Sequence, residues 1–437
     1  MGKKDDVMIQ PENIYQDVRY LTEEIGIRIA GSEKEKLASE YLKQRFLQYI
    51  PDCRIEEFQT KCRKVSKEEL RAQIEGVWVE IPVRLRNVSP TTNGKTLEAE
   101  PVFFDGHTDY QRSDISYVNG KAVIHYGGFP TEDAYRRMME AQPAFLIFAD
   151  TRYTGSSIVA NSLLPANVEK FGAVPSVDVS FPDVWRICTQ KATMLSLCVE
   201  GSMEIGCSQN IIATIPGTDP EAGCIYLGSH VDSVAGSPGA DDNAVGCAIL
   251  LELARILSSK RYRNTIRFIA FGSEEQLSVG SAAYVRNHRK ELETKGFFIC
   301  NFDSCASAVG WNKFVINANE LLRTNMKEIY NGQDVFYNEV LEPDPCNDVF
   351  PFTAAGVPGI TLMRNNCEAG KFYHHTPDNN LRVISPEIAA KLAEASAKLV
   401  LKLADMPYNR DKYAIAEGME KKVSELWEEN YGGWQNV

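Results

Sequence analysis

The spacing of hydrophobic residues predicts two amphipathic helices near the N-terminus. The first stripe recurs at helical intervals and consists of Ile14, Val18, Leu21 and Ile25. A second stripe with the same spacing consists of Ala38, Tyr41, Leu42, Phe46 and Ile50. The segment 26–32 between them contains two glycines and is interpreted as a loop.

The pattern changes between about residues 71 and 190, where short apolar or alternating runs recur. They lie at 77–83, 122–125, 144–149 and 174–177, and Gly, Pro, Asn and Thr separate them. Runs of this length with such punctuation are typical of strands and turns. This region is therefore predicted to be a small β-rich domain.

Strands and helices alternate from about residue 196 onward. Apolar runs predict buried strands at 224–229, 265–271, 297–302 and 360–363, and an amphipathic stretch predicts a helix at 386–404. Such alternation indicates an α/β layered sheet. Polar residues follow most of these strands, at the edge where open α/β sheets bind ligands.

Composition restricts the possible partners. The 437 residues suggest two or three domains, or one large domain with an insertion. A formal net charge of −12 argues against nucleic acid as a partner. No apolar run reaches the roughly 18 residues of a membrane span, and no secretory signal is recognisable, so we expect a cytosolic protein. The 11 cysteines are scattered, often in apolar runs, and are interpreted as reduced.

Candidate metal ligands are concentrated in one part of the chain. His230 and Asp232 follow the predicted strand 224–229, and two further carboxylates precede a helix-like run. Imidazole and carboxylate ligands without an obvious thiolate suit Zn, Mn or Co. Each candidate has an ordinary alternative, such as a helix cap or an exposed acidic turn, but together they favour a metal site. Besides His230 and Asp232, the candidates are the two carboxylates before the helix-like run, Asp241 and Asp242, and five residues further along the chain: Glu274, Glu275, Asp303, His374 and His375.

Local geometry suggests how these residues divide their roles. His230 and Asp232 point to the same side of an extended segment, so the carboxylate can hold the ring nitrogen that binds no metal. Glu274 and Glu275 point to opposite sides, so one can bind metal while the other accepts a proton. Of the two adjacent aspartates, only one need be a ligand.

These residues resemble the motifs of the M28 zinc peptidases, a family of co-catalytic two-zinc aminopeptidases. The resemblance covers roughly residues 200–400 and rests on Gly228–Ser233, Gly239–Gly246, Gly272–Ser281, Asn301–Asp303 and His375–Pro377. It implies a mixed, mostly parallel sheet flanked by helices. A weaker resemblance, through 118–125 and 172–177, relates the middle region to the protease-associated (PA) domain inserted in many members.

The resemblance also implies a domain layout and a set of roles. The expected layout is N-terminal helices packing on the catalytic domain (1–70), a PA-like insert (71–190), the catalytic domain (191–405) and a C-terminal tail (406–437). Glu274 would be the general base, and Asp232 would orient His230. Two zinc ions would be bound by His230, Asp303, Glu275, His375 and the bridging Asp242.

Two departures from the family pattern concern the paired histidines. The acidic residue usual four places after the ligand His is Asn379 here, whereas Asp378 lies four places after His374, which makes His374 a rival ligand to His375. Family members often place an oxyanion-stabilising Tyr directly before the ligand His. We therefore predict that His375 binds metal and that His374 stabilises the transition state.

The predicted function is that of an aminopeptidase acting on peptide substrates through a water activated between two zinc ions. The alternatives are a carboxypeptidase or a glutaminyl cyclase-like enzyme on the same fold, or a non-catalytic protein that binds partners through its PA-like domain. The adjacent Glu274 and Glu275 argue against a mere binder, which has no use for a base. The sequence does not determine side-chain specificity, native metal, oligomeric state or the role of the tail.

Overall fold

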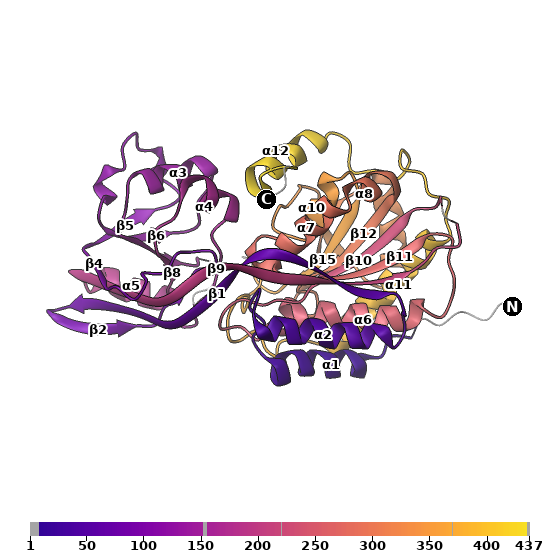
Figure 1. Cartoon of the computed structure of the whole chain (residues 1–437), viewed down its shortest axis with the longest axis horizontal. Coiled ribbons are helices and arrows are strands. Elements are labelled where there is room, and N and C mark those ends of the chain that lie inside the picture. The colour runs from indigo at the N-terminus through magenta and orange to yellow at the C-terminus, as the bar shows by residue number, and fades with distance from the viewer. Residues whose placement is uncertain (1–7, 152–154, 220, 369, 435–437) are drawn as a thin grey trace.

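The computed structural model describes residues 8–151, 155–219, 221–368 and 370–434 and has two lobes (Figure 1). The N-terminal helices are α1 (Pro11–Arg19), a π-helical continuation at Tyr20–Ile25, and α2 (Glu33–Leu47). Both predicted stripes lie against the core, with only Tyr41 partly exposed, and the loop falls where it was predicted. No helix in the described ranges is long and apolar enough to cross a membrane.

The large lobe is built on a ten-stranded mixed sheet. Its central strands β11, β10, β12 and β15 run parallel, and β9 and β13 flank them in the antiparallel direction. In sheet order the main path is β14 (Tyr337–Val340), β13 (Trp311–Asn317), β15 (Gly359–Asn365), β12 (Gly296–Phe302), β10 (Cys224–His230), β11 (Thr265–Phe271), β9 (Met194–Ile215), β1 (Cys53–Ile74) and β2 (Val77–Ile81), and β4 (Leu97–Ala99) pairs with β9.

Helices cover both faces of this sheet because successive side chains of a strand alternate between faces. Ile225 and Leu227 of β10 pack into the core with α1, α2, α6 and α11, whereas Tyr226 packs into the core on the opposite face. Besides α1 and α2, the helices of the large lobe are α6 (Val245–Leu257), α7 (Val279–Asn287), α8 (Arg289–Lys295), α9 (Glu320–Asn331), α10 (Val349–Ala354) and α11 (Pro386–Ala404). The predicted strands and the predicted final helix are all present.

The small lobe contains a second sheet, in the order β3-β8-β7-β6-β5, in which β5 to β8 are parallel. Its strands are β3 (Arg84–Leu85), β5 (Pro101–Asp105), β6 (Ala122–Tyr126), β7 (Phe145–Ala149) and β8 (Ser176–Asp178). Parallel strands need crossover connections, so this region is less purely β than predicted. It also forms α3 (Glu132–Glu140), α4 (Pro165–Phe171) and α5 (Phe181–Thr189).

Two strands of 22 residues each, β1 and β9, pair antiparallel along the length of both lobes (Figure 1). One part of the ribbon packs with the core of the small lobe through Leu70 and Leu197, and another part packs in the large lobe through Ile211. The predicted domain boundary at residue 71 falls inside β1, and the boundary at 190 lies just before β9.

The C-terminal segment forms the helix α12 (Glu420–Tyr431). This helix contacts α10 of the large lobe and α4 of the small lobe. Trp427 and Tyr431 are buried against Phe350, and Arg286 donates to the backbone carbonyl of Tyr431. The tail, which received no role from its sequence, therefore connects the two lobes.

Candidate metal centre

The predicted site residues come together at the carboxyl edge of the central parallel strands. His230 is the last residue of β10, and Asp303 directly follows β12. Glu274 and Glu275 lie in the loop after β11. The other members come from the segment before α6 and from the loop after β15, and they are Asp242, His374 and His375.

Asp242 lies between two groups of side chains. On one side, its Oδ1 is 3.1 Å from Nε2 of His230, which is also 3.8 Å from Oδ1 of Asp303. On the other side, Oδ2 of Asp242 is 3.5 Å from Nε2 of His375. Nε2 of His375 is in turn 2.9 Å from Oε2 of Glu275. The two oxygens of one carboxylate thus face two separate sets of candidate ligands.

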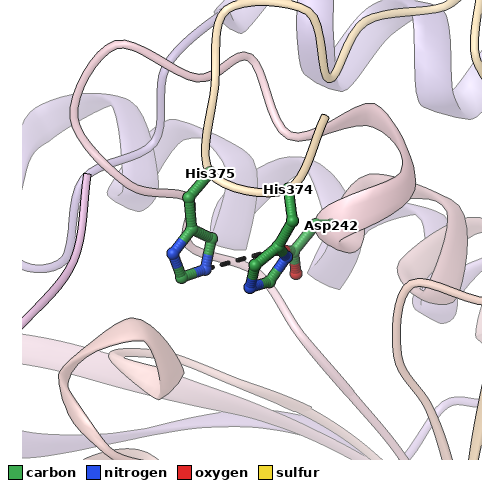
Figure 2. Close-up of side chains that lie close together, drawn as sticks. All are labelled: Asp242, His374 and His375. Carbon is green, nitrogen blue, oxygen red and sulfur yellow. Dashed lines mark ion pairs between the residues drawn. The ribbon is translucent and has the colours of Figure 1, made fainter. Parts of the chain in front are cut away.

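His374 is closer to this centre than its predicted role requires. Its Nδ1 is 2.9 Å from Oδ2 of Asp242, and its ring stacks on that of His375 with 3.6 Å between ring centroids (Figure 2). The ligand atoms of Asp242, His374 and His375 could hold one ion, as could those of His230, Asp242 and Asp303. His374 thus competes with Glu275 for a place in the second set, and its predicted role in stabilising the transition state stays a prediction.

Asp241 is turned away from the centre into a structural network. Its carboxylate accepts hydrogen bonds from the Ala306 N–H at 2.8 Å and from the Tyr373 hydroxyl at 3.0 Å. Its own N–H donates to Oδ1 of Asn379 at 2.8 Å. Asn379, at the position where the family pattern expects an acid, thus holds the backbone beside Asp242. Asp378 is exposed, and Ser157 donates to its carboxylate.

Asp232 has a role that its spacing did not indicate. Its two carboxylate oxygens accept the backbone N–H groups of Glu274 and Glu275 at 3.0 and 3.2 Å. Nδ1 of His230 is 3.2 Å from the main-chain oxygen of Asp232 and 3.6 Å from Oδ1. Asp232 therefore anchors the loop that carries both glutamates, in addition to lying beside the histidine.

The clustered buried carboxylates of the site favour the binding of cations. Burial and the neighbouring Asp348, Asp303 and Glu275 raise the pKa of Glu274 well above its usual value, although His230 opposes this shift. Burial disfavours the charged form of His230, but the carboxylates around the ring raise its pKa well above 6.5. Buried carboxylates are stable when paired or bound to metal.

Individual atoms of the centre also fit metal ions. Nδ1 of His230 is aimed at a carbonyl oxygen and so carries the proton of the neutral ring, while Nε2 faces carboxylates that only accept. A cation between Nε2 and these carboxylates satisfies both. Oε1 of Glu275 is buried, and the described part of the chain offers it no hydrogen bond. Imidazole and carboxylate donors of this kind suit zinc.

A cleft of about 390 Å³ opens onto this centre, and both lobes line it. Leu163 and Leu164 contribute from the small lobe, and Lys371 contributes from the loop after β15. The N–H of Ala160 donates to the main-chain oxygen of His375 at 3.1 Å. Sequence reasoning missed these residues, since neither apolar loop residues nor a single lysine carry a recognisable signal.

Comparison with known proteins places the chain among peptidases. Residues 210–400 match the profile of Peptidase family M28. Aminopeptidase YwaD of Bacillus subtilis (strain 168) is 26% identical over 444 residues, which cover 97% of this chain and 91% of that protein.

Two solved structures have a similar fold. BSAP, a zinc aminopeptidase from Bacillus subtilis, matches with a TM-score of 0.74 and 21% identity over 92% of this chain and 96% of that chain. A peptidase M28 precursor from Shewanella amazonensis SB2B matches with a TM-score of 0.76 and 21% identity over 91% of this chain and 95% of that chain.

The mixed sheet with clustered carboxylates and imidazoles at its carboxyl edge is the arrangement of a metal-dependent α/β enzyme. Residues 210–400 match peptidase family M28, and a relative named as an aminopeptidase is similar over nearly the full chain. The solved structures confirm the predicted fold class.

Proposed function

We propose that this protein is a two-zinc aminopeptidase that releases residues from the N-terminus of peptides. The observation that carries the proposal is the position of Asp242, whose two oxygens face His230 on one side and the paired histidines on the other. A relative named as an aminopeptidase over nearly the full chain and a similar fold described as a zinc aminopeptidase support the choice.

The residues of the centre divide into ligands and a proton carrier. His230, Asp303, Glu275, His375 and the shared Asp242 would hold two zinc ions. When bound, such ions supply Lewis acidity that activates a water molecule and polarises the scissile carbonyl.

Glu274 is the group placed to move the proton. Its Oε2 is 3.9 Å from Nε2 of His230, and its Oε1 accepts the Ser278 hydroxyl at 3.1 Å. Glu274 would accept the proton of the attacking water and deliver it to the leaving amine, as a general base that becomes a general acid.

His374 would contribute a hydrogen bond to the developing oxyanion. Burial and the adjacent His375 lower the pKa of His374 to about 3, so its ring is neutral at physiological pH. A neutral imidazole carries one N–H. Nδ1 lies 2.9 Å from Oδ2 of Asp242, so the ring can donate to substrate only when its single proton is on Nε2.

The small lobe would shape access to this chemistry. It lines the cleft through Leu163 and Leu164 and contacts the main chain of His375 through Ala160, but it supplies none of the proposed ligands. We therefore treat residues 71–190 as a PA-like insert that selects peptides by size. Excising the insert should leave zinc binding largely intact and change the ratio of long to short peptide cleavage.

The proposed activity is tested with three substrates: a dipeptide with a free amine, the same dipeptide with a blocked amine, and a peptide with N-terminal Gln. Cleavage of the first alone, lost on chelation and restored by zinc, is the expected result. Cleavage of the blocked dipeptide would indicate a carboxypeptidase instead. Cyclisation of the Gln peptide would indicate a cyclase, and inactivity on all three would favour a binding protein.

A further inference from the structure

The loop that carries Glu274 and Glu275 has a conformation that its own residues do not favour. Ser273, Leu277 and Ser278 have φ angles of 54°, 72° and 47°, in the left-handed region that non-glycine residues rarely occupy. Such conformations persist where surrounding contacts hold them. The contacts that hold this loop therefore decide where the two glutamates point.

Three successive backbone N–H groups of this loop donate to two buried carboxylates. Those of Glu274 and Glu275 donate to Asp232, as described above. The N–H of Ser273 donates to Oε1 of Glu35 at 3.2 Å. Glu35 lies in α2, far from the loop in sequence, and is only 1% exposed.

Glu35 does not act as an ordinary helix cap. Ser32 and Glu35 have the spacing of a capping box, in which the Glu side chain accepts the N–H of the Ser. The Ser32 hydroxyl does accept the N–H of Glu35 at 3.2 Å. The Glu35 carboxylate, however, accepts the Gly31 N–H at 2.6 Å and the Ser208 hydroxyl at 2.8 Å, in addition to the Ser273 N–H.

Packing leaves the start of the loop little freedom to move toward α2. A Cβ added at Gly272 would lie 2.2 Å from Oγ of Ser208 and 3.0 Å from Oε1 of Glu35. The N–H of Gly272 also donates to Oδ1 of Asn210, on β9. The carboxylate of Glu35, which extends from α2, thus packs between β9 and the backbone directly before Glu274.

We propose that Glu35 is a positioning residue for the proton-transferring Glu274 and for Glu275. By accepting the Ser273 N–H, it fixes the left-handed turn from which both glutamates enter the centre. This inference rests on the proposed function for its kinetic consequence, but its structural consequence is measurable without any substrate. The N-terminal helices would then support the chemistry as well as cover the sheet.

The test uses Glu35→Ala and Glu35→Gln, with Glu33→Ala as the matched control. Glu33 lies in the same first turn of α2 but is exposed, so its loss matches the change in helix-end charge. The Gln side chain keeps one oxygen that can accept the Ser273 N–H. Hydrogen exchange of the amides at 272–280, zinc content, kcat and KM are measured on the full chain.

Glu35→Ala should speed exchange at Ser273, Glu274 and Glu275 and lower kcat by about 10²-fold, as small misplacements of catalytic groups do. KM and exchange elsewhere should match the wild type, and one of the two zinc ions should bind more weakly because Glu275 is a proposed ligand. The loop exchange and kcat of Glu35→Gln should lie between those of Glu35→Ala and the wild type. Glu33→Ala should resemble the wild type in both measurements.

Two results would overturn the inference. One is wild-type kcat and wild-type loop exchange in Glu35→Ala. The other is a uniform rise in exchange across the large lobe in both Glu35 variants, which would make Glu35 a general stabiliser. If the wild type cleaves no peptide but exchange at 273–275 still rises selectively in Glu35→Ala, the proposed function fails while the positioning role stands.

Discussion

The two lobes each contain parallel strands with a buried histidine, but the surroundings shift the pKa of the two histidines in opposite directions. His230 ends β10 of the large sheet, and His125 lies near the end of β6 of the small one. Both rings are fully buried. Carboxylates surround His230 and raise its pKa, whereas burial lowers the pKa of His125 to about 4.

The surroundings of His125 satisfy a neutral ring completely. Its Nδ1 donates to the Gly127 carbonyl and its Nε2 accepts the Tyr110 hydroxyl, each at 2.9 Å. The nearby Asp178 is already paired with Arg86 at 2.8 Å. Charges at this edge are balanced by protein groups, whereas the carboxylates around His230 need an added cation. An uncompensated buried charge is unfavourable, so the carboxylates around His230 favour a bound cation and the surroundings of His125 do not.

The largest effect is expected from removing the shared carboxylate. Asp242→Ala should reduce peptidase activity to that of the wild type treated with a chelator. Its zinc content should fall below the two equivalents per chain expected for the wild type, because both ligand sets contain Asp242. Metal analysis by mass spectrometry checks the stoichiometry. In the small lobe, Asp178→Ala is the counterpart. It should cost about 3–5 kcal/mol of stability by leaving Arg86 unpaired, with zinc retained. A wild type that saturates at one equivalent would contradict the two-zinc centre.

Replacing the proposed base, Glu274, should separate chemistry from metal binding. Glu274→Gln preserves the shape of the side chain but cannot accept the proton, so kcat should fall about 10²–10⁴-fold with zinc content unchanged. Glu275→Gln is the matched change one residue later and should weaken the binding of one ion. Turnover near that of the wild type in Glu274→Gln would remove this residue from the mechanism.

The paired histidines should differ in the same two measurements. His375→Ala should lose one zinc ion. His374→Ala should keep both and lower kcat about 10²–10³-fold, the usual cost of losing one oxyanion donor. If the ion is instead lost with His374, then His374 and Asp242 form the second set, as the 2.9 Å contact between them allows.

The smallest effect is expected in the stability of the small lobe at acid pH. The pKa of His125 is about 4 when folded and about 6.5 when unfolded, so the unfolded chain binds the extra proton between these values. Stability should therefore fall as pH drops from 6.5 to 4, by up to about 3 kcal/mol. His125→Phe should be less stable at pH 8 but lose less between pH 6.5 and 4 in urea titrations. An unchanged slope would show that His125 does not titrate on unfolding.

Periodicity predicted α1, α2, α11 and the central strands β10, β11, β12 and β15, because these elements bury regular stripes such as Ile14 and Val18 in α1. It made no prediction for β13, β14 or α7 to α10 of the large lobe. It missed α3, α4 and α5, whose 7 to 9 residues are too short for a helical stripe to stand out among turn residues. The tail gave no signal either, since Trp427 is buried only where α12 meets α10.

The sequence by itself determined which residue types are available for metal chemistry and on which strand ends they stand, because motif spacing and strand period are local properties. The resemblance had already indicated Asp242 rather than Asp241, and tertiary structure supplies the physical reason. Asp241 is held by Ala306 and Tyr373, and these contacts join segments far apart in the chain. Tertiary structure also brought Glu35 to Ser273, across more than two hundred residues. Buried hydrogen bonds and charge balance depend on every neighbour in space, and spacing along the chain does not carry that information.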